Sequence, residues 1–325
     1  MKIVLIIPYY GKFPNYFQLF LDSCGKNPAF NWLIFTDDKT PYRFPDNVNV
    51  VYNSFAECRE RIQSKFDFPV LLTEPQKLCD YKCAYGFIFE DYLKDVDFWG
   101  YCDVDVIFGR LDYFITEELL NNFDKIFSLG HLTLYRNTSE INRVFMNEFN
   151  GKKRYKEVFQ TNVGCAFDEW YPENINDIFR QTHYRLKLDN LCADIESYKT
   201  RFILNTYNLQ KKTYEHMDQR NMIFEYIEGH IFQIVKENKS FKKKEYPYLH
   251  LQKRNMSICI NVDTYEGYYI VPNRFVPLDS NILSLFRKNL VYEILNFQFF
   301  KVKYKSLKLR IKRIKLKRQG ITNDT

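Results

Sequence analysis

The segment Phe98–Gly109 most constrains the fold, because it combines bulky apolar residues with two aspartates, Asp103 and Asp105. An apolar run of this kind, ended by a glycine, predicts a strand that is buried on both faces. A buried carboxylate is costly unless a cation or hydrogen-bond donors compensate it. Both aspartates are therefore candidate ligands for a divalent metal, Mg²⁺ or Mn²⁺, that shares its shell with substrate phosphates. The alternative is that they only cap the turn after the strand.

The start of the chain predicts an α/β architecture. β-Branched and aromatic runs predict strands, and one segment carries apolar residues at helical spacing. In chain order these are strand 2–7, helix 14–24, strand 31–35 and strand 48–51. A strand, helix, strand order is typical of a mostly parallel sheet with helices on its faces.

Ligands bind beyond the carboxyl ends of the strands in such sheets. This rule places Pro8, Tyr9 and Tyr10, which follow the first strand, at the same edge as Asp37 and the aspartate pair. No Gly-x-Gly-x-x-Gly follows the first strand, so a dinucleotide-type phosphate loop is not supported.

Three charged residues, Lys77, Asp80 and Lys82, precede the aspartate segment. They could simply form the solvated start of a helix. In the functional interpretation, the two lysines contact phosphates and Asp80 contacts sugar hydroxyls.

Two later segments carry further candidates. Asp168 and Glu169 follow a small-residue turn and could face an acceptor or a reacting carbon, or cap the next helix. His250 lies in an apolar run with Lys253 three residues later. A histidine there is often a hydrogen-bonded core residue, but with two metal-type aspartates elsewhere we favour a metal ligand.

Taken together, the motifs resemble the GT-A class of nucleotide-sugar glycosyltransferases. More closely, they are similar to a bacterial glycosyltransferase-like family, long labelled a domain of unknown function, found in polysaccharide gene clusters. The matching segments, in chain order, are Ile7–Gly11, Ile34–Asp38, Lys77–Lys82, Phe98–Asp105, Gly130–Asn137, Phe167–Trp170 and His250–Arg254. The resemblance implies a Rossmann-like GT-A domain with a mixed, mostly parallel sheet flanked by helices.

The resemblance also implies roles. Asp103 and Asp105, with His250 in retaining members, would bind Mn²⁺ or Mg²⁺ on the diphosphate of a donor, with a UDP-sugar expected. Lys253 would contact the phosphates, although its spacing from the histidine differs from the His-x-x-Gly-x-x-Lys form. Asp37 would hold the nucleoside, and a ring of Tyr9 or Tyr10 would stack on the base.

Chemistry supports the same assignment independently of the family. Sugar transfer requires the leaving phosphate to be neutralised as the bond breaks, which a metal and a lysine can do. An inverting enzyme also needs a carboxylate base on the acceptor hydroxyl, and a retaining enzyme could use a carboxylate to stabilise the sugar cation. Asp168 and Glu169 are the catalytic candidates. The resemblance implies that the acceptor is a glycan or a lipid-linked saccharide of bacterial surface polysaccharide synthesis.

Two other classes of function remain. One is a metal-dependent nucleotide-sugar hydrolase or nucleotidyltransferase that uses the same two aspartates, Asp103 and Asp105. The other is a non-catalytic binding protein.

The C-terminal tail carries the positive charge of the chain. From Phe299 onward, ten basic residues and one acid give +9, and the remaining 37 basic and 39 acidic residues give −2. A basic segment with interleaved apolar residues is typical of a membrane-surface anchor. The near-neutral body argues against nucleic acid, and a disordered solubilising tail is the simplest alternative.

These features predict a domain organisation and a location. We expect a catalytic domain at 1–260, a helical extension at 261–298 and a membrane-associating tail at 299–325. Eight cysteines without metal spacing indicate reduced thiols. No apolar run reaches the ~20 residues that span a bilayer. The predicted location is the cytoplasm, peripheral on the inner face of the membrane.

Overall fold

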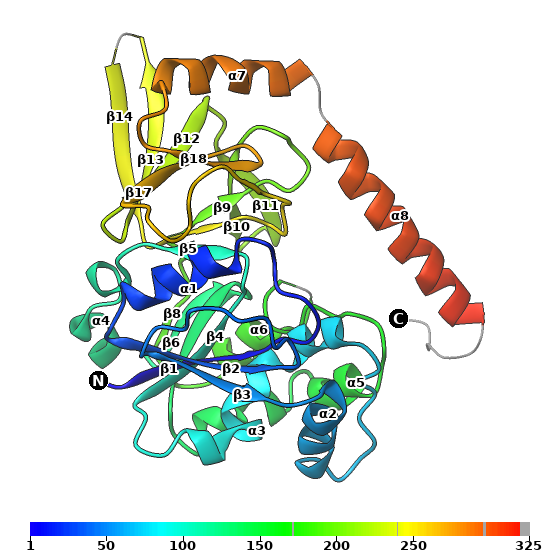
Figure 1. Cartoon of the computed structure of the whole chain (residues 1–325). Coiled ribbons are helices and arrows are strands. Elements are labelled where there is room, and N and C mark those ends of the chain that lie inside the picture. The colour runs from blue at the N-terminus through cyan, green and yellow to red at the C-terminus, as the bar shows by residue number, and fades with distance from the viewer. Residues whose placement is uncertain (171, 239, 295–296, 319–325) are drawn as a thin grey trace.

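A computed structural model describes the chain except residues 171, 239, 295–296 and 319–325, and it contains three mixed β-sheets with helices around them (Figure 1). The largest sheet has seven strands in the order β3-β2-β1-β4-β7-β6-β8. Its strands are β1 (Ile3–Pro8), β2 (Phe30–Thr36), β3 (Val48–Tyr52), β4 (Phe98–Cys102), β6 (Lys125–Leu129), β7 (Leu132–Arg136) and β8 (Leu186–Lys187). Strands β3, β2, β1 and β4 are parallel, so the predicted mostly parallel sheet with flanking helices is confirmed for this part of the chain.

Strand β1 shows that this sheet is buried on both faces. Ile3, Leu5 and Ile7 belong to one apolar cluster, whereas Val4 and Ile6 belong to another. Side chains alternate between the two faces of a strand, so each face is covered by its own core. Continuous apolar runs in the sequence are the expected signature of this two-sided burial.

The helices are short, apart from the last two. The α-helices are α1 (Phe17–Gly25), α2 (Phe55–Ser64), α3 (Tyr85–Ile88), α4 (Glu117–Asn122), α5 (Arg154–Phe159), α6 (Ile175–Arg180), α7 (Ile282–Ile294) and α8 (Phe297–Arg318). The 3₁₀ helices are η1 (Pro75–Ala84), η2 (Glu90–Tyr92), η3 (Leu111–Tyr113) and η4 (Ile141–Met146). Helix α2 begins at a capping box, in which the Ser54 hydroxyl accepts from the Glu57 amide and Glu57 accepts from the Ser54 amide. No described helix is long and apolar enough to cross a membrane.

The predicted single strand at Phe98–Gly109 is wrong in one respect, because the chain leaves the first sheet after β4. Asp103, Val104 and Asp105 form a break, and β5 (Val106–Phe108) then enters a second sheet. There β5 pairs antiparallel with β15 (Tyr248–His250), with Val106 opposite His250. The half-buried Asp103 and the buried Asp105 interrupt an apolar run, and the two sheets meet at these aspartates.

The second and third sheets were not predicted from the sequence. The five-stranded sheet has the order β11-β10-β9-β15-β5, with β9 (Ala193–Ile195), β10 (Leu204–Asn208) and β11 (Thr213–Asp218). The six-stranded sheet has the order β14-β13-β12-β17-β18-β16. Its strands are β12 (Met222–Ile227), β13 (His230–Glu237), β14 (Ser240–Tyr246), β16 (Ser257–Ile258), β17 (Gly267–Val271) and β18 (Arg274–Pro277).

These strands change the interpretation of the C-terminal region. The segment 261–298 was expected to be helical, but its first half supplies β17 and β18 to the six-stranded sheet, and α7 comes only after them. A boundary at residue 260 would therefore cut through this sheet. The tail is a helix, α8, as far as the structure describes it.

Candidate functional site

The break between β4 and β5 lies beside His250 on β15. The His250 Nε2 atom is 3.5 Å from Asp105 Oδ1 and 3.9 Å from Asp103 Oδ2. One ligand atom from each of the three residues lies within 4.8 Å of the others. The pairing of β5 with β15 thus brings together residues that are about 145 positions apart in the sequence, and the three predicted metal ligands form one cluster.

Backbone hydrogen bonds hold Asp105 against the turn after β15. Its carbonyl oxygen accepts from the Leu251 amide at 2.8 Å, and its Oδ2 accepts from the Lys253 amide at 2.5 Å. Burial disfavours the carboxylate, but His250 and Lys253 outweigh this effect and lower the pKa of Asp105. The carboxylate is therefore held ionised at a buried position, where a cation would be stabilised.

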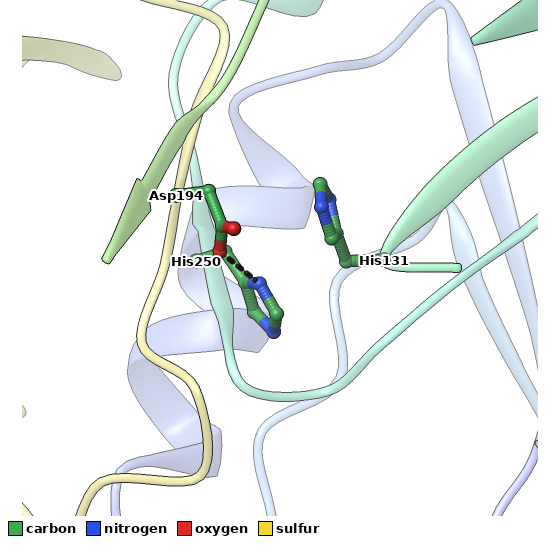
Figure 2. A group of neighbouring side chains, drawn as sticks. All are labelled: His131, Asp194 and His250. Atoms are coloured by element: carbon green, nitrogen blue, oxygen red, sulfur yellow. Dashed lines mark hydrogen bonds and ion pairs between the residues drawn. The ribbon is translucent and has the colours of Figure 1, made fainter. Parts of the chain in front are cut away.

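A second carboxylate orients the histidine. The His250 Nδ1 atom is 2.8 Å from Asp194 Oδ1 on β9 (Figure 2). Burial opposes an imidazolium, yet Asp105 and Asp194 outweigh burial and raise the pKa of His250 well above its ordinary value. A carboxylate on Nδ1 fixes the tautomer that presents Nε2 to a metal. Binding a cation here would replace the histidine proton.

His131 completes this buried group. Its ring centroid lies 4.5 Å from that of His250, and its Nδ1 is 2.8 Å from the Tyr248 hydroxyl. Burial lowers the pKa of His131 to about 4, so this ring is neutral. His131, Asp194 and His250 could also group around an ion. Because they share His250 with the aspartate cluster and its Nδ1 is occupied by Asp194, we interpret them as the shell that orients His250.

The donor set of the aspartate cluster suits a divalent transition metal. Two carboxylates and one imidazole nitrogen form a mixed set of oxygen and nitrogen donors. Such a set fits Mn²⁺ better than Mg²⁺, which prefers an all-oxygen shell. The residues present therefore fit the metal that the sequence implied.

The aspartates open onto a cavity of about 800 Å³. Strands β1 and β4 run parallel, so Pro8, which ends β1, and Tyr9 and Tyr10, which follow it, lie at the same edge where Asp103 follows β4, and all four line the cavity. Part of η1 and the turn after β15 form other walls, and Lys82, Asp105, Lys253 and Lys308 also line it. The volume is in the range of small-molecule sites.

Lys82 links the cavity to the second predicted acidic pair. Its Nζ donates to Asp103 Oδ1 at 2.7 Å and to the Gly130 carbonyl at 2.9 Å, and it lies 3.7 Å from Asp168 Oδ2. Burial lowers the pKa of Lys82, but Asp103 and its neighbours raise it by more, so the lysine is a cation.

Asp168 and Glu169 pack behind Lys82 and are not among the residues that line the cavity. Glu169 Oε2 accepts from the Gly130 amide at 3.0 Å. A Cβ at residue 130 would collide with Asp168 Oδ2, so a larger residue here would displace that carboxylate. Burial raises the pKa of both carboxyls, and the pKa of Asp168 is raised well above its ordinary value. Neither side chain caps α6, because Asn174 does so.

Lys77 and Asp80 have internal partners. Lys77 Nζ donates to Asp80 Oδ2 and to the Val163 carbonyl, both at 2.7 Å. Asp80 also accepts from the backbone amides of Cys165 and Phe167. Neither residue lines the cavity. The pair instead anchors the loop that leads to Asp168.

The first strand ends place the remaining candidates. Asp37 Oδ1 accepts from the Gly11 amide at 2.7 Å, so it supports the loop after β1, but it does not line the cavity. The Tyr9 ring stacks on Phe13 with centroids 4.7 Å apart. The Tyr10 hydroxyl donates to Asn53. Of the residues predicted to hold the nucleoside, Pro8, Tyr9 and Tyr10 line the cavity and Asp37 does not.

Sequence reasoning missed Asp194 and His131 as members of the site. Asp194 stands in a three-residue strand, too short to give a periodic signal, and an aspartate inside an apolar run was the only clue. His131 was part of a matched motif, but its contact with His250 depends on the pairing of distant strands.

Comparison with known proteins identifies a family. Residues 5–279 match the family described as Family of unknown function (DUF6625). The chain belongs to this family. No curated protein matches the chain. The DUF6625 match covers the site and, apart from the first two residues of β1, all three sheets, whereas α7 and α8 lie beyond it.

Proposed function

We propose that this chain is a metal-dependent glycosyltransferase of the GT-A type. It would move a sugar from a nucleoside-diphosphate donor, with a UDP-sugar expected, to a glycan or lipid-linked saccharide in surface polysaccharide synthesis. The observation that carries the proposal is the cluster of Asp103, Asp105 and His250 at the edge of an aromatic and cationic cavity. Its position at the carboxyl ends of β1 and β4 is where ligands bind in parallel sheets.

The phosphate end of the donor would lie at the aspartates. Asp103, Asp105 and His250 would hold Mn²⁺ or Mg²⁺, which supplies positive charge to the leaving diphosphate. Lys82 and Lys253 line the same cavity and would stabilise the charge that develops on the phosphate oxygens. As transfer proceeds, the bond from the anomeric carbon to the phosphate oxygen breaks and the nucleoside diphosphate leaves with the bonding electrons. The acceptor hydroxyl oxygen bonds to the anomeric carbon and releases its proton to a base or to water.

The nucleoside end would lie against the residues after β1. Tyr9 and Tyr10 both line the cavity, and an aromatic ring at this position would suit stacking on a base. Asp37 would act through the loop that it supports, because it bonds to Gly11.

The acidic pair behind Lys82 would act on the reacting centre. Because neither side chain lines the cavity, we assign Asp168 and Glu169 to acting on the sugar cation or the acceptor proton through Lys82, whose Nζ lies 3.7 Å from Asp168 Oδ2. Asp168→Asn or Glu169→Gln should then lower kcat with little change in nucleotide affinity, because the interaction is made in the transition state. Wild-type turnover in both variants would assign the pair to positioning Lys82 and Gly130.

The direct experiment measures nucleotide release. The full chain is incubated with Mn²⁺ and a panel of nucleotide sugars, with and without saccharide acceptors, and free nucleoside diphosphate and the sugar product are quantified. A transferase releases nucleotide faster with the right acceptor and forms a glycoside. Equal release with and without any acceptor would instead identify a nucleotide-sugar hydrolase. Absence of both nucleotide and metal binding would identify a non-catalytic protein.

A further inference from the structure

Helix α8 presents an exposed apolar stripe. Five large apolar side chains follow one another at intervals of four, three, four and three residues, which places them on one side of a helix. They are Phe300, Tyr304, Leu307, Ile311 and Ile314, with exposed fractions of 70, 59, 54, 45 and 45 %. No other described helix exposes such a row. A row of this kind needs a partner, because contiguous apolar surface is unfavourable in water.

The positive charge of α8 indicates which kind of partner the stripe would contact. The helix holds ten lysines and arginines and no acid between Phe297 and Arg318. Exposed basic residues such as Lys301 and Arg310 lie close to the stripe in sequence. A second copy of α8 packed on the stripe would bring two such helices together, and their like charges would repel. An anionic surface that also accepts apolar side chains has the opposite charge and the right polarity.

We infer that α8 is an interfacial helix that binds the surface of a membrane containing anionic phospholipid. The stripe would enter the boundary between head groups and acyl chains, and the basic side chains would contact lipid phosphates. This role is independent of the proposed reaction and uses a part of the chain outside the DUF6625 match.

The same helix borders the cavity. Lys308 lines the cavity that contains Asp103, and Lys303 Nζ lies 5.4 Å from the ring centroid of Tyr198 on the body. In Figure 1, α8 descends from α7 along one side of the molecule. A helix bound to lipid would therefore hold the cavity next to the membrane surface. If the transferase proposal is right, this geometry favours the lipid-linked member of its two acceptor classes.

Vesicle sedimentation tests the inference with the full chain. Vesicles of phosphatidylcholine with phosphatidylglycerol are compared with phosphatidylcholine alone, at low salt and at high salt. We expect binding to the anionic vesicles, at least about tenfold weaker binding to neutral ones, and release as salt screens the charges. Equal binding to both kinds of vesicle, or none to anionic ones, would overturn the inference.

Paired substitutions separate the stripe from other apolar surface. Leu307→Ser with Ile311→Ser should reduce binding at least about tenfold, since two apolar side chains no longer enter the lipid. Leu191→Ser with Met217→Ser removes two comparably exposed side chains from the body and should bind as wild type does. Equal binding by the α8 pair and wild type would contradict the assignment. The assignment would also be contradicted if the wild type is a dimer in vesicle-free solution and the Leu307→Ser, Ile311→Ser variant is a monomer. A second copy of the chain would then be the partner of the stripe.

These readouts need no substrate. Failure of vesicle binding would leave the transferase proposal standing, and failure of transfer would leave the membrane assignment standing. A linked test then addresses the acceptor class: the α8 pair should retain transfer to a water-soluble acceptor and lose most transfer to one embedded in anionic vesicles. Equal loss on both acceptors would contradict the link between α8 and a lipid-linked acceptor.

Discussion

Two lysines of the 3₁₀ helix η1 each form an ion pair with an aspartate, Lys77 with Asp80 and Lys82 with Asp103. The nitrogen–oxygen distance is 2.7 Å in both pairs, but their surroundings differ. In the Lys77–Asp80 pair both side chains are at most 4 % exposed, and every described partner is internal. In the Lys82–Asp103 pair the aspartate side chain is 27 % exposed, and its second oxygen faces His250 across the cavity edge.

The difference separates a scaffold from a site. Asp80 accepts from one lysine and from backbone amides, so its capacity to bind anything else is used within the fold. Asp103 pairs with Lys82 but also shares a small space with Asp105 and His250, so two carboxylates and an imidazole lie close together. Gathering like charges costs stability, and proteins retain such clusters where function requires them. The remaining predictions test this contrast.

The largest effect is expected from Asp80→Ala. Removing one partner of a buried pair leaves the Lys77 charge and two backbone amides uncompensated, which typically costs about 3–5 kcal/mol. Chemical denaturation should show this loss in the free energy of unfolding. Asp37→Ala, an exposed aspartate with a single backbone donor, is the matched control and should cost far less. Similar losses in the two variants would show that Asp80 is not a scaffold residue.

A smaller effect is expected from Asp194→Asn. The variant keeps the shape of the residue but weakens its hold on His250 Nδ1, and the loss of such an orienting carboxylate costs about 10–100-fold in metal affinity. Calorimetric titration with Mn²⁺ measures this change. A purely structural role for Asp194 would lower the melting temperature and leave the affinity of the folded protein unchanged.

The smallest effect is expected from Lys65→Gln. Lys65 and Glu90 form a 2.8 Å pair in which the side chains are 23 and 43 % exposed. Exposed pairs contribute less than about 1 kcal/mol, because water and salt screen them. The unfolding free energy and the metal affinity should both remain near wild type. A loss comparable to that of Asp80→Ala would mean that burial does not rank these ion pairs.

The sequence predicted the first sheet well because local patterns determine it. The runs at β1 and β2 are almost entirely apolar and β3 is rich in valine, and this composition is readable without knowing their neighbours. The break at Asp103 was read as the end of one strand, since a run of apolar residues does not reveal that its two halves enter different sheets. Similarly, β17 depends on pairing with β12, about 45 residues earlier in the chain, and β18 then pairs with β17.

The site was predictable by residue type and less so by position. Asp103, Asp105 and His250 were named as one metal set, and the structure brings them together. Lys77 and Asp80 carried the same kind of signal as Lys82, but only the fold shows which charges are satisfied internally. Asp194 was missed because its importance comes from one contact across strands that are 56 residues apart.

The central claim is that Asp103, Asp105 and His250 form a metal-binding centre for a nucleoside diphosphate. The most direct test is calorimetric titration of UDP in the presence of Mn²⁺ into wild type and into Asp103→Asn, with folding of both checked by melting temperature. We predict that wild type binds only when the metal is present, and that the folded variant binds at least about 100-fold more weakly because a charged metal ligand is lost. Metal-dependent binding by Asp103→Asn with wild-type affinity would contradict the claim.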